Sequence, residues 1–424
     1  MFEEKHAKYV EPEHGPVFFP NKQNEFLWYS ERDGYDHLYR YNTEGTLLGQ
    51  VTKGDWDVTE VLGFDAKGKT LFIQRAADLG LQRQVAAIDL KKGDIRPLTS
   101  SPGTHEGHLS PDGAHLLDTW SSTSLPYQAL LWKTRKAELV DTLYTASDPL
   151  AGFARTEMKF FQLEADDGTP LNCRLILPPG FDSTRRYPVF YYLYGGPHAQ
   201  LIQNKWLGGA RTFLHYMAQR GYVVFTLDNR GSAHRGLAFE QATFRQLGTV
   251  EARDQMVGVN WLKDQPYVAP NRMAIHGWSY GGFMTINMML RHPDAFQVAV
   301  CGGPVIDWNF YEVMYTERYM DTPEENPKGY AEAALQNHAT NLKGDLMVIQ
   351  GLRDKTVLAQ HIYDFLQTCV DQDVQFDFFP YPRYEHHVRD RNRLHLLALM
   401  RDYVDERLKP RRRKKKLGRD MFKK

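Results

Sequence analysis

Short apolar strands alternate with helix-like segments over residues 156–408, and this alternation constrains the fold most. Representative strands are "YPVFYYLYGGP", "GYVVFTLDNRG", "RMAIHGWSYGG", "QVAVCGGP" and "DLMVIQG", each ending in glycine or a polar loop. Helix-like segments between them include "GGARTFLHYMAQR", "VEARDQMVGVNWLKDQ" and "LAQHIYDFLQTCVDQ". Continuously apolar strands are buried on both faces, which requires a largely parallel sheet covered by helices on each side. We therefore predict one α/β domain over residues 151–408, with an antiparallel pair of strands in "MKFFQLEADDGTPLNCRLILPPG" at its start.

The first 150 residues contain a repeat of a different kind. Pairs of apolar residues recur at 26–27, 71–72 and 116–117, each in a short strand that follows a turn. A period near 45 residues, with several strands per repeat, is typical of a β-propeller blade. We predict about three blades over residues 1–150, and three irregular antiparallel hairpins are the alternative. Because a closed propeller needs about four to eight blades, we expect that upstream blades are missing or that the blades form an open stack.

The chain of 424 residues has no formal net charge, but its charge is unevenly distributed. Residues 409–424 contain ten Lys or Arg and one Asp, which leaves 42 basic and 51 acidic residues elsewhere. A terminal block of one sign is typical of a disordered, solvated tail, although it can also contact an anionic surface. The tail alone predicts no nucleic-acid partner.

Several other classes of protein are not indicated. No apolar run reaches about 18 residues, so no transmembrane helix is predicted, and "MFEEKHAKYVEPEHGP" lacks the apolar core of a signal peptide. Cys173, Cys301 and Cys369 are widely spaced, which indicates neither a disulfide framework nor a zinc site. No phosphate-binding loop occurs. We therefore predict no metal or organic cofactor, and the residues leave the cellular compartment unknown.

Ser279 lies in a G-x-S-x-G sequence, between Gly277 and Gly281, after an apolar strand and before a helix-like segment. In an α/β hydrolase this arrangement is the nucleophile elbow. Its tight turn lifts the serine oxygen out at the carboxyl edge of the sheet and directs the N-terminus of the next helix towards it. A serine that merely lies in a glycine-rich turn is the alternative, but the surrounding α/β domain favours a nucleophile.

A serine nucleophile needs a base, and the base needs an orienting carboxylate. In this fold the chain order is serine, acid, histidine. Asp354 follows an apolar strand in "VIQGLRDKTV", and His386 and His387 follow another in "DFFPYPRYEHHVRD". We predict that Asp354 is the acid, with a helix cap as the alternative, and that one of the two histidines is the base. The histidines in helix-like contexts are interpreted as surface or core residues: His338, His361 and His395.

Four segments together resemble the prolyl oligopeptidase family, and within it the dipeptidyl peptidase IV branch: "GWSYGGF", "DNRGSAHRG", "DWNFYEVMYTERYM" and "GLRDKTV". "SERDGYDHLYRYNTEG" and "VTKGDWDVTEVLGFD" are similar to the closing propeller blades of bacterial members. The resemblance covers nearly the whole chain except the basic tail. It implies an α/β-hydrolase domain preceded by the last blades of a propeller. The implied activity is that of a serine peptidase that releases Xaa-Pro dipeptides through an acyl-enzyme.

The resemblance also implies roles for individual residues. The family's triad falls on Ser279, Asp354 and His386, because Tyr381-Pro382 sets the register of the histidine. Its oxyanion hole falls on the backbone N–H of Tyr280 and the hydroxyl of Tyr194 in "LYGGP", where a packed strand-end tyrosine is the alternative. Its proline pocket falls on Tyr280, Val305, Trp308, Tyr311, Tyr315 and Val357.

Two features of this region bear on substrate binding. Trp308, Tyr311 and Tyr315 have i, i+3, i+7 spacing, so we expect one helix face that lines the pocket or packs in the core. An aromatic slot suits a pyrrolidine ring, which it buries without requiring a hydrogen bond. Thr356 occupies the position where related enzymes commonly have an Asn that contacts the substrate carbonyl. Because its side chain is shorter, we expect that contact to be weaker or bridged by water.

The family's glutamate pair, which holds the amino terminus of the substrate, and an arginine that helps to hold the substrate backbone are expected upstream of Met1. Glu11 and Glu13 in "VEPEH" are interpreted as ordinary linker residues between blades. The resemblance further implies peptide substrates with proline at the penultimate position, a homodimer, and a parent protein that is periplasmic or secreted. A broader acyl hydrolase (an acylaminoacyl peptidase, oligopeptidase or esterase) is one alternative function. A non-catalytic module whose blades bind a protein partner is the other.

Overall fold

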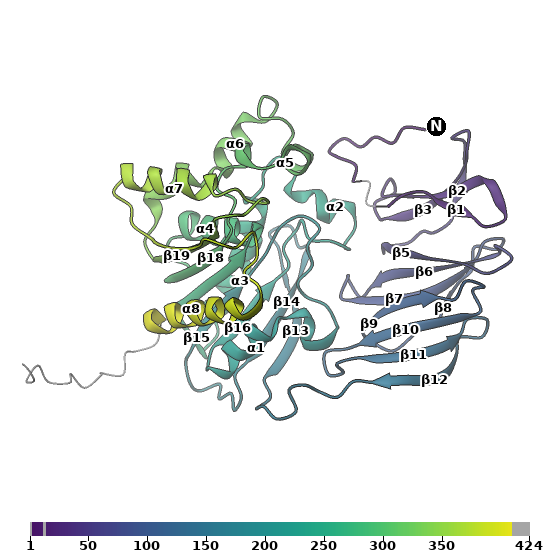
Figure 1. Ribbon diagram of the computed structural model, residues 1–424, viewed down its shortest axis with the longest axis horizontal. Helices are drawn as coiled ribbons and strands as arrows, with labels where there is room; N and C mark the ends of the chain where they lie inside the picture. The colour runs from purple at the N-terminus through teal and green to yellow at the C-terminus, as the bar shows by residue number, and fades with distance from the viewer. Residues whose placement is uncertain (1, 12–13, 409–424) are drawn as a thin grey trace, which may run out of the picture.

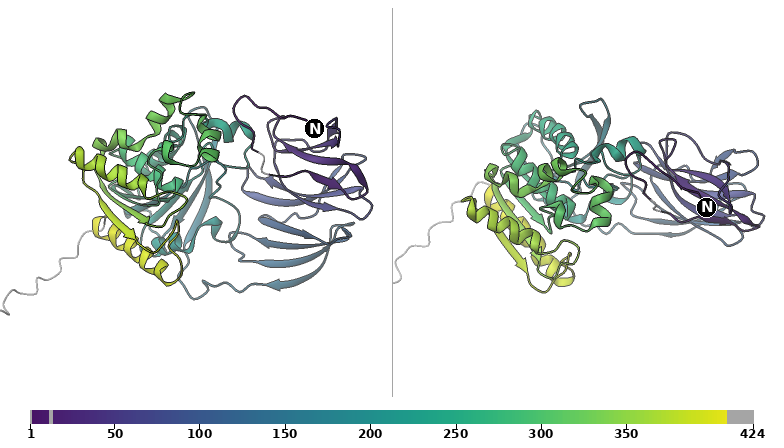
Figure 2. Two further views of the ribbon diagram at one scale, coloured as in Figure 1. Left: turned by 45° about the horizontal axis from the view of Figure 1, so that its top comes forward. Right: turned by 90° about the horizontal axis from the view of Figure 1, so that it is seen from above.

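The computed structural model describes residues 2–11 and 14–408, so the predicted disordered tail lies outside the described residues. These residues form two parts that lie side by side in every view, twelve strands in one and an α/β domain in the other (Figures 1 and 2). Strand β12 ends at Thr145 and strand β13 of the α/β domain begins at Glu157. The predicted fold class, propeller blades followed by an α/β-hydrolase domain, is confirmed.

The first part consists of three antiparallel units of four strands each. The first unit is a separate sheet in the order β1-β2-β3-β4, and the other two are joined into one larger sheet by a single bridge between β7 and β9. The first contains β1 (Val17–Phe19), β2 (Lys22–Ser30), β3 (His37–Asn42) and β4 (Leu47–Gln50). The second contains β5 (Val58–Phe64), β6 (Thr70–Ala77), β7 (Gln82–Asp89) and β8 (Ile95–Pro97). The third contains β9 (Thr104–Leu109), β10 (His115–Ser121), β11 (Gln128–Lys133) and β12 (Glu138–Thr145).

The 45-residue repeat arises because the second strand of each unit is buried. Leu27 in β2, Leu71 in β6 and Leu116 in β10 are all completely buried. The first two belong to one apolar cluster that joins the first unit to the second. Each unit therefore buries its apolar face against its neighbour, as propeller blades do, and the alternative of three irregular hairpins is wrong.

The α/β domain is built on one eight-stranded sheet in the order β13-β14-β16-β15-β17-β18-β19-β20. The six strands from β16 to β20 in that order are parallel, and β13 and β14 form the predicted antiparallel pair at one edge. The strands are β13 (Glu157–Glu164), β14 (Pro170–Leu177), β15 (Tyr187–Tyr192), β16 (Val223–Leu227), β17 (Val268–Trp278), β18 (Val298–Gly302), β19 (Asp345–Gly351) and β20 (Asp377–Tyr381).

Helices cover both faces of this sheet because alternate side chains of each strand point to opposite sides. In β15, Tyr191 packs in a cluster with helices α3, α4 and α7, whereas Phe190 packs in a second cluster with α1 and α8. The helices are α1 (Thr212–Gln219), α2 (Leu237–Glu240), α3 (Val250–Lys263), α4 (Tyr280–Arg291), α5 (Val313–Met320), α6 (Pro327–Ala333), α7 (Gln360–Asp371) and α8 (Asp390–Leu408). Four short 3-10 turns are also present among the described residues: η1 (Trp206–Gly209), η2 (Gln241–Thr243), η3 (Trp308–Phe310) and η4 (Leu335–Asn341).

Two further features of the described residues concern the classes considered above. The three cysteines are buried and unbonded to one another. Over residues 2–11 and 14–408, none of the helices combines the length and the apolar character that a membrane span requires.

The buried leucine of β6 provides a test of the packing between blades. Replacing Leu71 with Ala should lower the free energy of unfolding by about 2–5 kcal/mol, because it leaves a cavity in a fully buried cluster. The control is Leu48→Ala in β4, where the side chain is 47% exposed and the expected change is within about 0.5 kcal/mol. Urea denaturation followed by tryptophan fluorescence measures both variants, and equal losses would contradict this packing.

Candidate active site

Ser279 occupies a strained turn between β17 and α4. Its backbone has φ 62° and ψ −121°, a conformation that a residue with a side chain adopts only at a cost. The turn is held by bonds from Ser279 N–H to the carbonyl of Gly302 (2.8 Å) and from Gly282 N–H to the carbonyl of Ser279 (2.8 Å). A Cβ atom on Gly277 would lie far inside contact distance of the Gly281 carbonyl. Glycines at both positions therefore permit the turn, and the partly exposed serine lies at the carboxyl end of β17.

Asp354 and His386 meet at the same edge of the sheet. Asp354 follows β19 and His386 follows β20, and His386 Nδ1 donates to Asp354 Oδ2 over 2.7 Å. The other carboxylate oxygen accepts from the backbone N–H groups of Thr356 and Val357, at 2.9 Å each. Burial alone would raise the pKa of Asp354, but the bonds from His386 and from these two amides hold that pKa below its ordinary value. The carboxylate thus stays ionised and fixes the tautomer of His386 that leaves Nε2 unprotonated.

Two residues that were not predicted from the sequence hold His386 in place. Trp278, next to the serine, donates its indole N–H to the carbonyl of His386 over 2.9 Å. Gly303 lies against His386 and Asp354, because a Cβ atom there would be 3.1 Å from His386 Cε1 and 3.5 Å from Asp354 Oδ2. Its backbone φ is also positive. The strand end that precedes the serine and the loop after β18 thus shape the histidine site.

Tyr194 and Tyr280 lie beside the serine. Tyr194 follows β15; burial raises the pKa of its hydroxyl, while the side chain of Ser279 opposes the rise. Tyr280 is the first residue of α4, where backbone N–H groups have no partner within the helix. The two rings are 6.0 Å apart. The hydroxyl and the amide predicted for the oxyanion hole therefore come from neighbouring residues at the same sheet edge.

The residues predicted to form the proline pocket come together as an aromatic cluster. The Trp308 ring lies 5.4 Å from that of Tyr280, 5.6 Å from that of Tyr311 and 6.0 Å from that of Tyr315. Val305 and Val357 are buried with 2% and 0% exposure, in the same apolar cluster as Trp308. Thr356 contributes its backbone N–H to Asp354, as described above.

The prediction that these aromatics share one helix face is wrong. Trp308 lies in the short turn η3, which Asp307 caps by accepting a bond from the Asn309 N–H. Tyr311 is then extended, with φ −90° and ψ 163°, and α5 begins only at Val313. The cap favours a helix start at Trp308, but the extended residue ends it, so Tyr315 reaches the cluster from a second helix.

Glu251 is a buried carboxylate that the sequence did not single out. It is fully buried in α3 and accepts a bond of 2.6 Å from the hydroxyl of Tyr280 and one of 3.0 Å from the Gly248 N–H. Burial raises the pKa of Glu251 from 4.5 to about 7, although both of these bonds lower it. Glu251 therefore fixes the ring of the residue that follows the serine.

Glu11 is not the ordinary linker residue that the sequence suggested. Its carboxylate bonds Arg318 Nη1 (2.6 Å) and the hydroxyl of Tyr319 (3.0 Å), both in α5, and forms an ion pair with His198. These contacts leave little indication in the sequence, because the partners of Glu11 lie about 190 and 310 positions away in the chain. Glu13, which was interpreted in the same way, lies outside the described residues.

The remaining predicted histidines are distributed as follows. His387 is exposed, with its ring 4.9 Å from that of His386. His361 is a core residue that accepts a bond from the Ile306 N–H, and His395 bonds the hydroxyl of Tyr381. His338 is partly exposed and bonds the carbonyl of Glu332. No group of three or more His, Cys, Asp or Glu side chains suited to a metal occurs within the described ranges.

Comparison with known proteins agrees with this geometry. The profile of the prolyl oligopeptidase family matches residues 210–411, and that of the dipeptidyl peptidase IV (DPP IV) N-terminal region matches residues 1–127. The chain therefore belongs to the prolyl oligopeptidase family, whose members include serine peptidases.

Its relatives within that family are of the dipeptidyl peptidase IV type. The chain is 31% identical to probable dipeptidyl peptidase 4 of Neosartorya fischeri, with 85% of this chain and 48% of that protein aligned. A crystal structure from Bacteroides ovatus, described as a "putative dipeptidyl aminopeptidase IV", has a TM-score of 0.92 and 41% identity over 95% of this chain and 60% of that one. The crystal structure of dipeptidyl peptidase 4 from Porphyromonas gingivalis has a TM-score of 0.87 and 32% identity. That comparison covers 93% of this chain and 56% of the other. The chain thus spans about half the length of the curated relatives it matches.

The turn at the serine predicts the effect of a single methyl group. Gly277→Ala should lower the melting temperature and displace the serine, because the new Cβ meets the Gly281 carbonyl. Gly152→Ala is the matched control, since nothing lies within 4 Å of a Cβ there and its φ is not positive. Differential scanning calorimetry measures both, and a Gly277→Ala protein as stable as the control would rule out this turn.

The buried Glu251 predicts a pH dependence of stability. Its folded pKa of about 7 lies above the ordinary 4.5, so the folded state binds the proton more tightly. The tighter binding of the proton stabilises the folded state fully below about pH 4.5. This stabilisation, roughly 3 kcal/mol, is lost as the pH rises through 7. Glu251→Gln should therefore gain stability relative to the wild type between pH 5 and 8, in denaturation measured across that range. Glu157→Gln, at an exposed position, is the control, and a pH-independent difference for Glu251→Gln would contradict the prediction.

Proposed function

We propose that the chain is a serine peptidase that hydrolyses peptide bonds after proline and releases Xaa-Pro dipeptides through an acyl-enzyme. The observation that carries the proposal is the 2.7 Å bond between His386 and Asp354 at the sheet edge where the turn presents Ser279. Membership of the prolyl oligopeptidase family supports it. A non-catalytic module would have no need for this arrangement of acid, histidine and strained serine.

In the proposed reaction His386 Nε2 takes the proton of the Ser279 hydroxyl as the oxygen attacks the carbonyl carbon of the proline residue. The negative charge that develops on the carbonyl oxygen is stabilised by the Tyr280 N–H and the Tyr194 hydroxyl. His386 then gives its proton to the departing amine, and the dipeptide stays bound to Ser279 as an ester. Water, activated by the same histidine, releases it. Asp354 remains ionised throughout and stabilises the protonated imidazole.

The aromatic cluster accounts for the proposed selectivity. A proline ring at the cleaved bond would lie among Tyr280, Trp308, Tyr311 and Tyr315, with Val305 and Val357 beneath them. Such a slot gains free energy by burying the flat, apolar ring and offers little to a polar side chain. Thr356, close to Asp354, is proposed to contact the substrate carbonyl through its hydroxyl or through water.

Other aspects of this proposal come from the resemblance alone. Natural substrates are proposed to be peptides with proline at the penultimate position. A homodimer, and a parent protein that is periplasmic or secreted, stay predictions.

The proposal predicts that Ser279→Ala abolishes catalysis. Release of the chromophore from Gly-Pro-arylamide should fall by about 10⁴-fold or more, because the nucleophile is lost, and a fluorophosphonate should no longer label the protein. Ser122→Ala, in the loop that follows β10 of the third blade, is the control and should retain both activities. Labelling that survives Ser279→Ala would refute the proposal.

The N-acetylated form of the same arylamide separates the two enzyme classes considered from the sequence. Cleavage of the free amine alone supports release of dipeptides. Cleavage of both forms identifies a peptidase with a proline pocket but without recognition of the amino terminus, which is the broader acyl hydrolase.

A further inference from the structure

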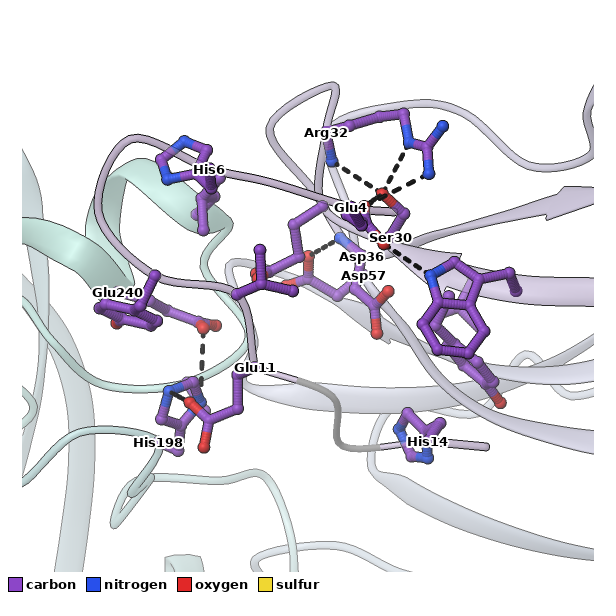
Figure 3. A pocket seen from close by; sticks show the side chains of 18 of the residues that line it. Glu4, His6, Glu11, His14, Ser30, Arg32, Asp36, Asp57, His198 and Glu240 are labelled. Carbon is purple, nitrogen blue, oxygen red and sulfur yellow. Dashed lines mark hydrogen bonds and ion pairs between the residues drawn. The ribbon is translucent and has the colours of Figure 1, made fainter. Parts of the chain in front are cut away.

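The carboxylate of Glu11 connects two segments that carry proposed site residues. On one side it forms an ion pair with His198, four residues after Tyr194 in the loop that follows β15. On the other side it bonds Arg318 and Tyr319 at the end of α5. Figure 3 shows Glu11 next to His198, with Glu240 on the other side of the imidazole. One side chain from the start of the chain thus holds both the tyrosine loop and the helix that lines the aromatic cluster.

The link from Glu11 to the proposed proline pocket is short. The ring of Tyr319 packs edge-on against that of Tyr315, with the centroids 4.8 Å apart. Tyr315 in turn stacks on Trp308, with an angle of 13° between the rings. A shift of the end of α5 would therefore be transmitted to the wall of the pocket through two aromatic contacts.

Burial and charge make this a strong interaction. The Glu11 side chain is only 12% exposed, and Tyr319 is 2% exposed. Burial by itself raises the pKa of Glu11, but the bond and charge of His198, with Arg318 and Tyr319, hold that pKa below its ordinary value. Bonds to an ionised carboxylate are about twice as strong as neutral ones. Removing the charge would break the ion pair with Arg318 and leave His198 with Glu240 on its other side.

The segment that delivers Glu11, residues 2–11, is called the strap, and it is fixed at both ends. At the blade end, Phe2 stacks on Tyr41 in β3 with the centroids 4.2 Å apart, and Glu4 accepts a bond of 2.6 Å from the indole of Trp28 in β2. At the other end, the Tyr9 carbonyl accepts a bond of 2.8 Å from the Gln241 side chain of the α/β domain. The strap also lines a cavity of about 170 Å³ between the first blade and the α/β domain, and none of the triad residues lines it (Figure 3).

We propose that Glu11 is a positioning residue: it holds the Tyr194 loop and α5 in the spacing that the proline pocket and the oxyanion hole require. This inference rests on the proposed function, because it assigns Glu11 an effect on that site. It also makes the strap part of the peptidase site, even though Phe2 and Glu4 of the strap pack on the first blade. Substrate selectivity would then depend on residues that lie outside the α/β domain.

The test compares Glu11→Gln with Glu4→Gln in the full chain. Both change one carboxylate of the strap to an amide, but among the described residues the hydrogen bonds of Glu4 go to the first blade, to Ser30, Trp28 and Arg32. For each protein we would measure kcat and KM for Gly-Pro-arylamide and Gly-Ala-arylamide, the rate of fluorophosphonate labelling, and the melting temperature. Tyr319→Phe is a second variant, which removes one bond to Glu11 and keeps the ring against Tyr315.

For Glu11→Gln we expect the ratio of kcat/KM for the proline and alanine substrates to fall by about tenfold, the order of one lost bond to a charged group. The labelling rate should fall as well, and Tyr319→Phe should give a smaller change in the same direction. Glu4→Gln should keep the wild-type ratio. Glu11→Asp, which retains the charge, should have a ratio between those of Glu11→Gln and the wild type.

Two results would overturn the inference. One is a Glu11→Gln protein that stays folded with the wild-type selectivity and labelling rate. The other is an equal loss in Glu4→Gln, which would mean that docking of the strap matters and Glu11 does not. The proposed function fails separately, when the wild-type chain is not labelled at Ser279 or cleaves no proline substrate. If Glu11→Gln does not fold, unchanged selectivity in Tyr319→Phe also counts against the inference.

Discussion

The strained turn at Ser279 is the constraint on which the rest of the site depends. A positive φ at this residue ends β17 and starts α4 within one step, so the serine oxygen and the first N–H groups of the helix face the same space. The turn is possible because Gly277 leaves room for the backbone of Gly281, and Gly281 leaves room for the carbonyl of Leu193. The parallel strands then bring Tyr194, Asp354 and His386 to the same edge, since each follows the carboxyl end of a strand.

Two buried carboxylates near this turn differ in the direction in which their pKa is shifted. Asp354 is buried but accepts bonds from His386 and from two backbone amides, so its carboxylate stays ionised. Glu251 is buried with one hydroxyl and one amide as donors, and its pKa rises to about 7. The difference suits their positions, because an orienting acid, the role proposed for Asp354, must carry charge, whereas Glu251 holds the Tyr280 ring.

Much of this arrangement could be predicted from the sequence, because it follows from local patterns. The alternation of strands and helices, the 45-residue repeat and the glycines around Ser279 each depend on residues close together in the chain. The chain order of serine, acid and histidine then pointed to Asp354 and to the segment of His386. Tyr194 needed the family resemblance, since a tyrosine at a strand end is usually only packed.

The parts that could not be predicted depend on contacts between distant segments. The bond from Trp278 to the His386 carbonyl, the bond from Tyr280 to Glu251, and the contacts of Glu11 with α5 leave no periodic pattern in the sequence. The prediction of one helix face from Trp308 to Tyr315 is wrong for a local reason instead. Its spacing was correct, but the extended residue at 311 breaks the segment into a 3-10 turn and a helix.

Ser279 is proposed to carry the dipeptide as an acyl-enzyme, and trapping this intermediate tests the role of the serine most directly. The full chain would be mixed with a Gly-Pro ester of a good leaving group, quenched in acid and examined by intact-protein mass spectrometry with peptide mapping. We expect one added Gly-Pro acyl group, located on Ser279. Release of the leaving group with no adduct, or with the adduct on another residue, would contradict it.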